Sequence, residues 1–315
     1  MKKFVHGCLP VLLTLGFTLF LTIRSEAQYE DELEDITGHY EAGLTIGENA
    51  FFGDLGGTRG IGRPFVKDFN SPTTRPLVGG FINYFYYSWL SVKFSLNYTN
   101  VDGADSLIKN TGDAERWRYY RNLSFRSRIF EGSLSADIYP VMMFDHDVEI
   151  HKIAPYVGLG LGLFHFNPQT FYDGQWVNLK PLHTEGEGFS GIDTSNGKPF
   201  PKNYHRLQLY IPLTVGLKVY FTNKIAMSVG ITFRHTFTDY IDDVSGYYVD
   251  PSLFSKYLSP SQAILAQQLY QRSLTPWKVR AGIARGDKSQ NDSYTTMFLT
   301  LSIRFGGGPK FYYGG

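Results

Sequence analysis

An acidic stretch in the last third of the chain holds the densest set of side chains that could do chemistry. Asp239, Asp242, Asp243 and Asp250 bring four carboxylates into a short span. Carboxylate oxygens are ligands that Ca²⁺ prefers, so these residues are candidates for a metal site. Their spacing lacks the alternate oxygens and the central glycine of an EF-hand loop. We therefore favour a solvated loop with turn-forming Asp residues, and no metal is expected.

A hydrolase at the membrane surface would need a histidine beside a carboxylate, together with a nucleophile. His235 and Asp239 are the nearest such pair, but no nucleophile accompanies them by pattern. The histidines are scattered, and no pair has the spacing of metal ligands on one helix face. The sequence therefore predicts no catalytic residue and no cofactor, and we expect that the chain is not an enzyme.

Alternation of apolar and polar residues with a period of two recurs along the chain and indicates strands. Leu90–Tyr98 shows it most clearly, while Leu77–Tyr86 is apolar on both faces, so its register stays open. Each stretch is long enough to cross a bilayer when tilted. The eight expected strands contain 40–46, 77–86, 90–98, 130–138, 157–163, 207–219, 225–233 and 297–305.

The connections between these stretches alternate in length. Tight turns are expected near Ser88 and Thr222, with a modest link at Pro140–Lys152. Short turns on one side and long loops on the other are typical of outer-membrane barrels, whereas a soluble β-sandwich has no reason to sort its loops. We predict an all-β transmembrane antiparallel barrel of about eight strands, with short periplasmic turns and long extracellular loops. The long segments are 48–74, 102–123, 168–205 and 238–293.

Charged residues also occur on the strand faces that would point into the barrel. An eight-stranded barrel is just wide enough for side chains to fill it, and both signs of charge are present. We therefore expect an internal ion-pair network that plugs the lumen, with a conducting or catalytic role as the alternative. The predicted network consists of Lys93, Glu131, Asp137, Lys218, Arg234 and Arg304.

The N-terminus has the layout of a secretory signal. Lys2 and Lys3 precede an apolar run, and Ser25-Glu26-Ala27 offers small residues for cleavage. We expect a signal peptide over 1–27, a periplasmic segment over 28–38, the barrel over 39–305 and a periplasmic tail over 306–315; a retained anchor is the alternative. The single cysteine, Cys8, lies in the signal, so no disulfide is expected. A net charge of +1 gives no reason to expect nucleic acid as a partner.

Several short blocks resemble one family when taken in order. Phe52–Gly57 follows the first expected strand and Arg75-Pro76 opens the second. Leu123–Ser127 opens the fourth, followed by Ile129–Glu131, and Phe237–Gly246 follows the seventh. Arg285-Gly286-Asp287 and Asn291-Asp292-Ser293-Tyr294 precede the eighth. Together these blocks resemble the PorG-like outer-membrane proteins of the type IX secretion system, over about residues 38–305.

The resemblance implies a part of a secretion machine rather than an enzyme. In that family the barrel is thought to tie a periplasmic ring (PorK–PorN) to the outer membrane, while cargo exits through another, larger channel. We therefore expect an outer-membrane scaffold whose partners are outer-membrane lipid and periplasmic ring lipoprotein or other ring subunits. The alternative is a generic small barrel that serves adhesion or passive permeation. No functional residue is carried over from the family.

Overall fold

The structure is a computed structural model that describes residues 38–55, 73–108, 112–144, 153–222, 224–274 and 279–306. The expected signal peptide, the segment over 28–37 and the tail after Gly306 lie outside these residues. Residues 56–72 of the first long loop also lie outside them.

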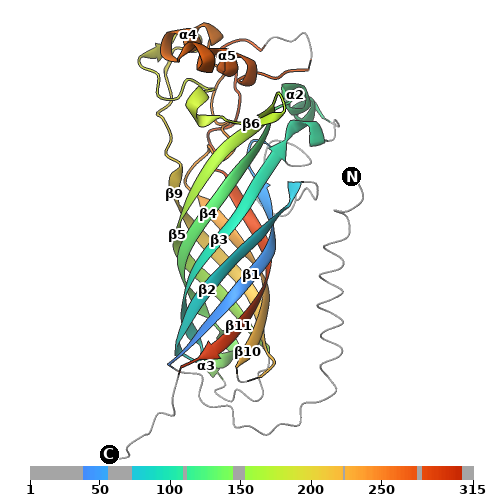
Figure 1. Ribbon diagram of the computed structural model, residues 1–315, viewed down its shortest axis with the longest axis vertical. Coiled ribbons are helices and arrows are strands. Elements are labelled where there is room, and N and C mark those ends of the chain that lie inside the picture. Colours follow the sequence, from blue (N-terminus) through green and yellow to red (C-terminus); the bar gives the residue numbers. More distant parts are fainter. Residues whose placement is uncertain are drawn as a thin grey trace, which may run out of the picture. The chain divides into compact units, whose positions relative to one another are not determined.

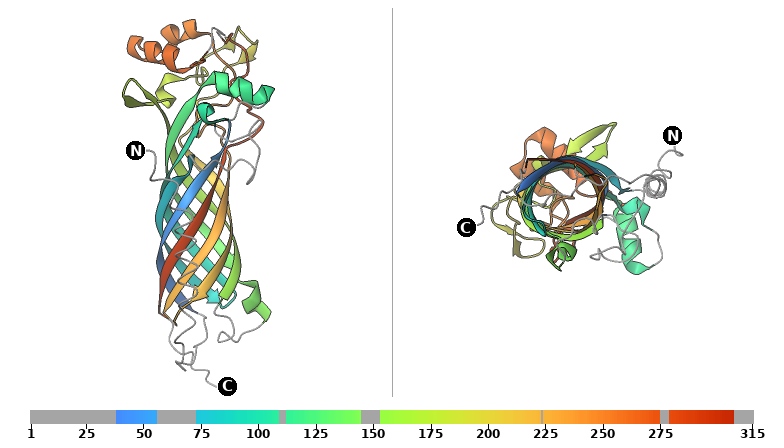
Figure 2. Two further views of the ribbon diagram at one scale, coloured as in Figure 1. Left: turned by 90° about the vertical axis from the view of Figure 1, so that its right-hand side faces the viewer. Right: turned by 90° about the horizontal axis from the view of Figure 1, so that it is seen from below.

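Within the described residues, eight strands form one closed antiparallel barrel (Figures 1 and 2). Consecutive strands pair around the ring, and the pairing of β1 with β11 closes it, with Tyr40 opposite Phe305. The predicted fold class is confirmed. The barrel strands are β1 (His39–Phe52), β2 (Arg75–Tyr87), β3 (Leu90–Ala104), β4 (Ser124–Ile138), β5 (Ile153–Tyr172), β9 (Leu207–Tyr220), β10 (Ile225–Thr236) and β11 (Ser293–Phe305).

The strands extend beyond the predicted segments on the side of the long loops. β5 is 20 residues long, whereas about 9–11 tilted residues suffice to cross a bilayer. The extracellular ends of β3, β4 and β5 therefore project past the membrane and carry the loop elements, which form a cap above the barrel (Figure 1). The other described elements are η4 (Asp105–Leu107), α2 (Asp113–Arg121), α3 (Pro140–Phe144), β6 (Gln175–Asn178), η5 (Lys180–Leu182), β7 (Ile192–Asp193), β8 (Lys198–Pro199), η6 (Pro251–Leu253), α4 (Phe254–Tyr257) and α5 (Pro260–Leu269).

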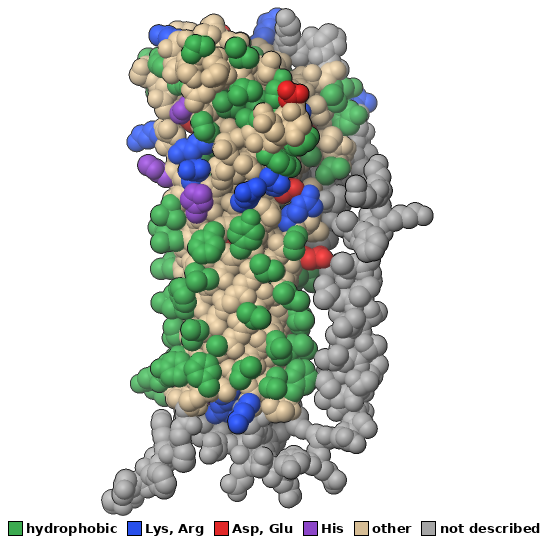
Figure 3. Space-filling model, in the orientation of Figure 1, with side chains coloured by type: hydrophobic (Ala, Val, Ile, Leu, Met, Phe, Trp, Pro, Cys, Tyr) green, Lys and Arg blue, Asp and Glu red, His purple; other side chains and the backbone are tan. Residues whose placement is uncertain are grey.

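The outer wall of the barrel is apolar over a broad belt (Figure 3). Leu44 and Leu161 are among the most exposed side chains, at 72% and 65%. A soluble protein would not leave so many aliphatic side chains in water, but a bilayer solvates them, and a closed barrel leaves no backbone edge unpaired in the lipid. The protein is therefore located in the outer membrane. Among the described residues, no helix has the length and apolar character to cross a bilayer.

Glycines on the inner wall make room for aromatic rings in the lumen. A Cβ added at Gly162 would lie 2.3 Å from Cε1 of Tyr210, and one added at Gly216 would lie 2.7 Å from the ring of Tyr156. Both tyrosines are buried. A small barrel has no space for both a side chain at these positions and the ring opposite. These glycines therefore allow the lumen to be packed.

Gly162→Ala is expected to destabilise the folded barrel by about 1–3 kcal/mol, because the new methyl group forces the buried Tyr210 ring to move. Guanidinium unfolding in lipid vesicles measures this loss. Gly80→Ala is the matched control, since its Cβ would have only ordinary contacts, the nearest at 3.5 Å from the Gly43 oxygen. Equal unfolding midpoints for the two variants would contradict the packing role of Gly162.

Candidate functional site

Two ion pairs occupy the periplasmic half of the lumen. Lys93 of β3 contacts Asp137 of β4, with 2.5 Å between Nζ and Oδ2. Lys218 of β9 forms a salt bridge with Glu41 of β1, and both side chains are buried. The Glu41–Lys218 pair joins distant parts of the ring, since β1 and β9 are not neighbours, and it therefore crosses the lumen. Lys93 and Asp137 lie on the neighbouring strands β3 and β4 instead.

A third ion pair lies in the extracellular half of the lumen. Glu131 of β4 accepts hydrogen bonds from Nε and Nη2 of Arg234 at 3.0 and 2.7 Å. Its other oxygen accepts a hydrogen bond from the Tyr294 hydroxyl at 2.6 Å, and Asn97 donates to Oε1 at 2.9 Å. Arg234 also donates to the Thr296 hydroxyl at 2.8 Å. Each charged group is thus paired and hydrogen-bonded, as a buried ion requires.

The structure brings together five of the six predicted interior residues as parts of these ion pairs. Arg304 lies at the periplasmic end of β11, half-buried, with its main-chain N–H donating to the Lys224 carbonyl at 2.7 Å. Glu41 was not among the predicted residues. It alternates with the outward-facing Tyr40 and Ala42, so the same alternation could have placed it inside the barrel.

Apolar clusters close both ends of the lumen. At the extracellular end, side chains from the barrel strands and from the cap form one buried cluster that includes Phe51, Ile129, Phe164 and Ile241. At the periplasmic end, Phe85, Tyr139 and Met142 pack with Tyr156, and Met142 comes from α3. Between these clusters a polar cavity of about 70 Å³ remains, enough for a few water molecules. The described residues therefore leave no continuous aqueous path.

The reconstituted protein is expected to be electrically silent in planar bilayers. Clusters at both ends and three ion pairs between them block the lumen, so ions have no hydrated route. The measurement is single-channel recording of the full chain, with a porin as the positive control. Stable conductance steps from the purified chain would contradict the closed lumen.

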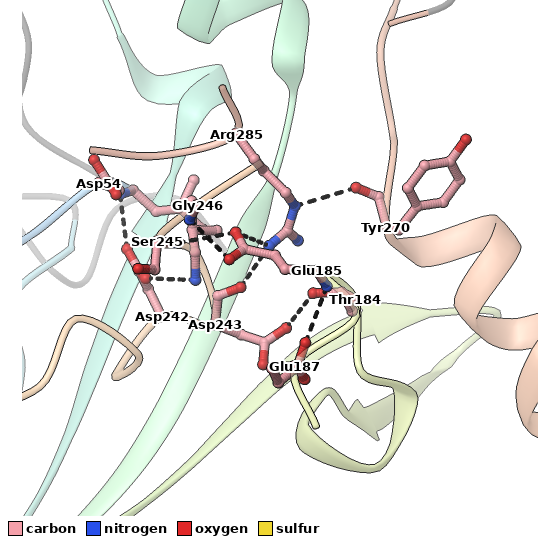
Figure 4. A network of polar contacts seen from close by, with 12 residues as sticks. Asp54, Thr184, Glu185, Glu187, Asp242, Asp243, Ser245, Gly246, Tyr270 and Arg285 are labelled. Carbon is pink, nitrogen blue, oxygen red and sulfur yellow. Dashed lines mark hydrogen bonds and ion pairs between the residues drawn. The ribbon is translucent and has the colours of Figure 1, made fainter. Parts of the chain in front are cut away.

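The cap contains a buried network of carboxylates, shown in Figure 4. Glu185 lies at its centre and accepts hydrogen bonds from the main-chain N–H groups of Ser245 and Gly246 at 2.9 and 2.8 Å. Arg285 donates to Glu185 at 3.1 Å and also to the main-chain oxygens of Asp243 and Tyr270. The network therefore joins the loop before β9 to both parts of the long loop between β10 and β11.

Further carboxylates of the network hold distant loops together through main-chain donors. Asp242 accepts hydrogen bonds from the N–H groups of Leu55 and Val244, each at 2.9 Å. Asp54 accepts one from the N–H of Asp287 at 2.8 Å. These carboxylates act as fixed acceptors for loop backbone that would otherwise be buried without partners. The network thus gives irregular loops a defined structure.

Burial raises the pKa values of several aspartate carboxyl groups in the cap. Desolvation, together with the nearby Asp54 and Asp242, raises the pKa of Asp239 to about 10. Burial raises the pKa of Asp54 to about 6, although the Asp287 N–H and Arg121 oppose the shift. The pKa of Asp292 is also well above its ordinary value, because it is buried beside Asp242 and Asp239. The cap therefore contains carboxyl groups that are protonated near neutral pH.

The predicted acidic loop is not solvated, and that interpretation is wrong. Asp242 and Asp243 are fully buried, because they supply acceptors inside the packed cap. Asp243 accepts hydrogen bonds from the hydroxyls of Tyr204 and Thr184, both at 2.7 Å. Asp250 lies apart from them and accepts a hydrogen bond from the Ser252 N–H at the start of η6. In the described part of the chain, no group of three or more His, Cys, Asp or Glu side chains is arranged to hold a metal ion.

The histidine and carboxylate considered for hydrolysis do not come together. His235 is exposed on the outer face of β10, where its ring contacts Phe237. Asp239 is buried within the cap instead. Because consecutive strand residues alternate between faces, the lipid-facing position of His235 separates it from the interior.

No protein-family model matches the chain, and no curated protein matches its sequence. Similar solved structures include the N-terminal β-barrel domain of OprF from Pseudomonas aeruginosa (12% identity, TM-score 0.33, covering 85% of this chain and 98% of that one). Neisserial surface protein A (NspA) is 10% identical with a TM-score of 0.36, covering 85% and 98%. OprG from Pseudomonas aeruginosa is 11% identical with a TM-score of 0.35, covering 88% and 100%. At these TM-scores the likeness carries no argument, and the outer-membrane location rests on the closed barrel and its apolar belt.

Proposed function

We propose that this barrel is an outer-membrane anchor of a type IX-like secretion machine and tethers periplasmic ring subunits to the membrane. The observation that carries the proposal is the closed lumen, with ion pairs between apolar clusters at its two ends. A barrel whose lumen is closed at both ends is suited to holding a partner in place rather than to passing cargo. Its short turns, such as the one between β9 and β10, would face the periplasm, where ring subunits would bind.

Parts of several blocks that resemble the PorG-like family meet in the cap. Leu55 of the block Phe52–Gly57 donates to Asp242 of the block Phe237–Gly246, and Asp54 accepts from Asp287 of the block Arg285-Gly286-Asp287. Asp292 accepts a hydrogen bond from the N–H of Ile241 at 2.8 Å. Blocks far apart in the sequence thus form one packed unit. This convergence supports the resemblance, because residues that build a shared structure are the ones a family would retain.

The first test is deletion of the gene in its own host. We expect deletion to abolish export of type IX cargo. Complementation with the full chain is expected to restore the export. A complementing variant with Gly80→Ala serves as a control for expression and membrane insertion. Normal cargo export in the deletion strain would refute the anchoring function.

The second test locates the partner surface. A photo-crosslinking residue at the exposed Thr222, in the turn between β9 and β10, is expected to capture a periplasmic ring subunit. The matched position in the cap is Ile192, which is 63% exposed. Crosslinks to ring subunits from Ile192 but not from Thr222 would place the partner on the wrong side of the membrane for an anchor.

A surface-binding role is the second candidate, and the exposed apolar side chains of the cap favour it. Ile192, Ile264 and Leu274 are 63%, 59% and 56% exposed. Large apolar side chains exposed to water often mark interaction sites. Replacing all three by Ser is expected to abolish adhesion if this role holds, while leaving cargo export intact. The closed lumen gives no such support to passive permeation.

A further inference from the structure

Three arginine side chains project from the outer wall of the barrel directly above the apolar belt. Arg126 and Arg128 are on the outward face of β4, and Arg206 immediately precedes β9. Figure 3 shows basic side chains and histidines gathered at the upper edge of the apolar belt on this face. The next outward side chain along β4 is Phe130, which is 56% exposed, and Leu207 beside Arg206 is 58% exposed. The arginines therefore lie at the boundary between acyl chains and headgroups.

The strand register and the hydrogen bonds bring the three guanidinium groups together. Arg128 lies opposite Asn167 of β5, and Asn167 accepts a hydrogen bond from Nη1 of Arg206 at 3.0 Å. Neighbouring strands are about 4.8 Å apart, so β4 and β9 lie about 10 Å apart across β5. Arg126 and Arg128 are two residues apart on one face, a separation of about 7 Å. This spacing suits one multiply charged headgroup.

One member of the set is held in position by its neighbours. The guanidinium of Arg126 lies over the ring of Trp176, with Cζ 3.7 Å from the ring centroid. Its Nη2 donates to Gln169 at 3.1 Å. A guanidinium that is held in one orientation by stacking loses little conformational freedom when it binds an external acceptor.

The carboxylate that lies opposite Arg126 is already paired with another arginine. Asp102 lies opposite Arg126 but binds Arg75, with 2.7 Å between Nη2 and Oδ2. Within the described residues, no ion pair involves Arg128 or Arg206. On the other side of the barrel, the corresponding outward position of β1 holds Glu48. Positive charge is thus concentrated on the β4–β5–β9 face, where like charges would repel unless an anion lies between them.

We propose that Arg126, Arg128 and Arg206 form a binding site for the phosphorylated headgroup of an outer-leaflet glycolipid. The acyl chains of this lipid lie along the apolar belt below, and its phosphates accept hydrogen bonds from the guanidinium groups. Arginine suits this role because its planar donors bind phosphate in a bidentate manner. The site is independent of the anchoring function proposed above.

The test uses the full chain in phosphatidylcholine nanodiscs that contain lipid A as the probe. Native mass spectrometry counts the lipid A molecules that each barrel retains. The test variant is Arg128→Gln/Arg206→Gln, and Arg116→Gln/Lys256→Gln, at exposed positions of α2 and α4, is the control with the same change of charge. Heat-dependent electrophoretic mobility verifies that each variant is folded. Further arms use dephosphorylated lipid A, and inorganic pyrophosphate as a soluble competitor.

We expect the test variant to retain lipid A about 25-fold less tightly, since each of the two basic residues near an anionic lipid surface contributes about fivefold. The control variant is expected to match the wild type, and dephosphorylated lipid A is expected to be lost. Equal retention by the test variant and the wild type would overturn the proposal, as would equal retention of the dephosphorylated lipid. Complete displacement by pyrophosphate would also overturn it, because the site would then bind soluble phosphate rather than a membrane lipid.

Discussion

Replacing Arg234 by Met is expected to destabilise the folded barrel by about 3–5 kcal/mol. The substitution removes the donors at 3.0 and 2.7 Å from Glu131 and leaves that carboxylate in the lumen with no cation beside it. Glu131 is completely buried, so water cannot compensate for the loss. The two remaining donors, Asn97 and Tyr294, are neutral. The measurement is the free energy of unfolding by guanidinium in lipid vesicles.

The double variant Glu131→Gln/Arg234→Met separates the loss of an attraction from the cost of an unpaired charge. Because a neutral amide needs no counter-ion, we expect the double variant to regain most of the stability that Arg234→Met loses. Lys93→Met provides a comparison with a partly exposed pair, since the Lys93 side chain keeps 18% exposure, and should cost less. If the double variant is as unstable as Arg234→Met, the loss comes from packing rather than from the buried charge.

Alternation with a period of two is enough to predict the barrel, because a residue that faces lipid must differ from one that faces the lumen. The alternation of apolar and polar residues is weakest at Leu77–Tyr86, where both faces are apolar. In the structure Val78 and Ile82 face outward, whereas the buried Asn83 faces the lumen with Phe85. Asn83 is the one polar residue that could have set this register, since a side-chain amide is costly in lipid. Apolar residues on both faces arise here because aromatic rings close the periplasmic end of the lumen.

The cap could not be predicted because its contacts are not local. Leu55 and Asp242 are 187 positions apart, and no periodic pattern records which loop backbone a carboxylate will bind. Even the buried face of α5 does not follow from its largest apolar side chains. α5 begins at Pro260, but its buried face is formed by Ala263, Ala266 and Leu269, while Ile264 is exposed. The small residues face inward because α5 packs closely on the loops beneath it.

The buried carboxyl groups make the stability of the cap depend on pH in a direction opposite to that of an ordinary salt bridge. Burial raises the pKa values of Asp54 and Asp243 to about 6 and that of Asp239 to about 10. A group whose pKa is raised in the folded state contributes stability that is fully present below its unfolded pKa, near 4. That contribution is lost as pH rises through the folded pKa. The cap is therefore expected to loosen progressively between pH 4 and pH 10.

Thiol labelling measures this loosening directly. Cys8 is replaced by Ser, and a cysteine is placed either at the buried Ala266 or at the exposed Ile264 of α5. The ratio of the two labelling rates removes the intrinsic pH dependence of the thiol. We expect the ratio of buried to exposed labelling to rise up to about tenfold per pH unit for each proton that the closed cap retains. A ratio that is constant from pH 5 to pH 9 would contradict the expected coupling.

Asp239→Asn is expected to remove one of the protons that the closed cap retains on its carboxyl groups. The variant cap should therefore be more stable than the wild-type cap above about pH 8. The amide occupies the same space without an ionisation to suppress, so the slope of the labelling ratio with pH should fall by one proton. Asp250→Asn is the matched control, because Asp250 caps η6 away from the buried carboxylates and should leave the slope unchanged. If Asp239→Asn destabilises the cap at every pH, then Asp239 acts there as an ionised hydrogen-bond acceptor. If instead Asp239→Asn stabilises the cap only at high pH, the closed cap is the protonated form. The loops that close the extracellular end of the barrel would then open when their carboxyl groups ionise.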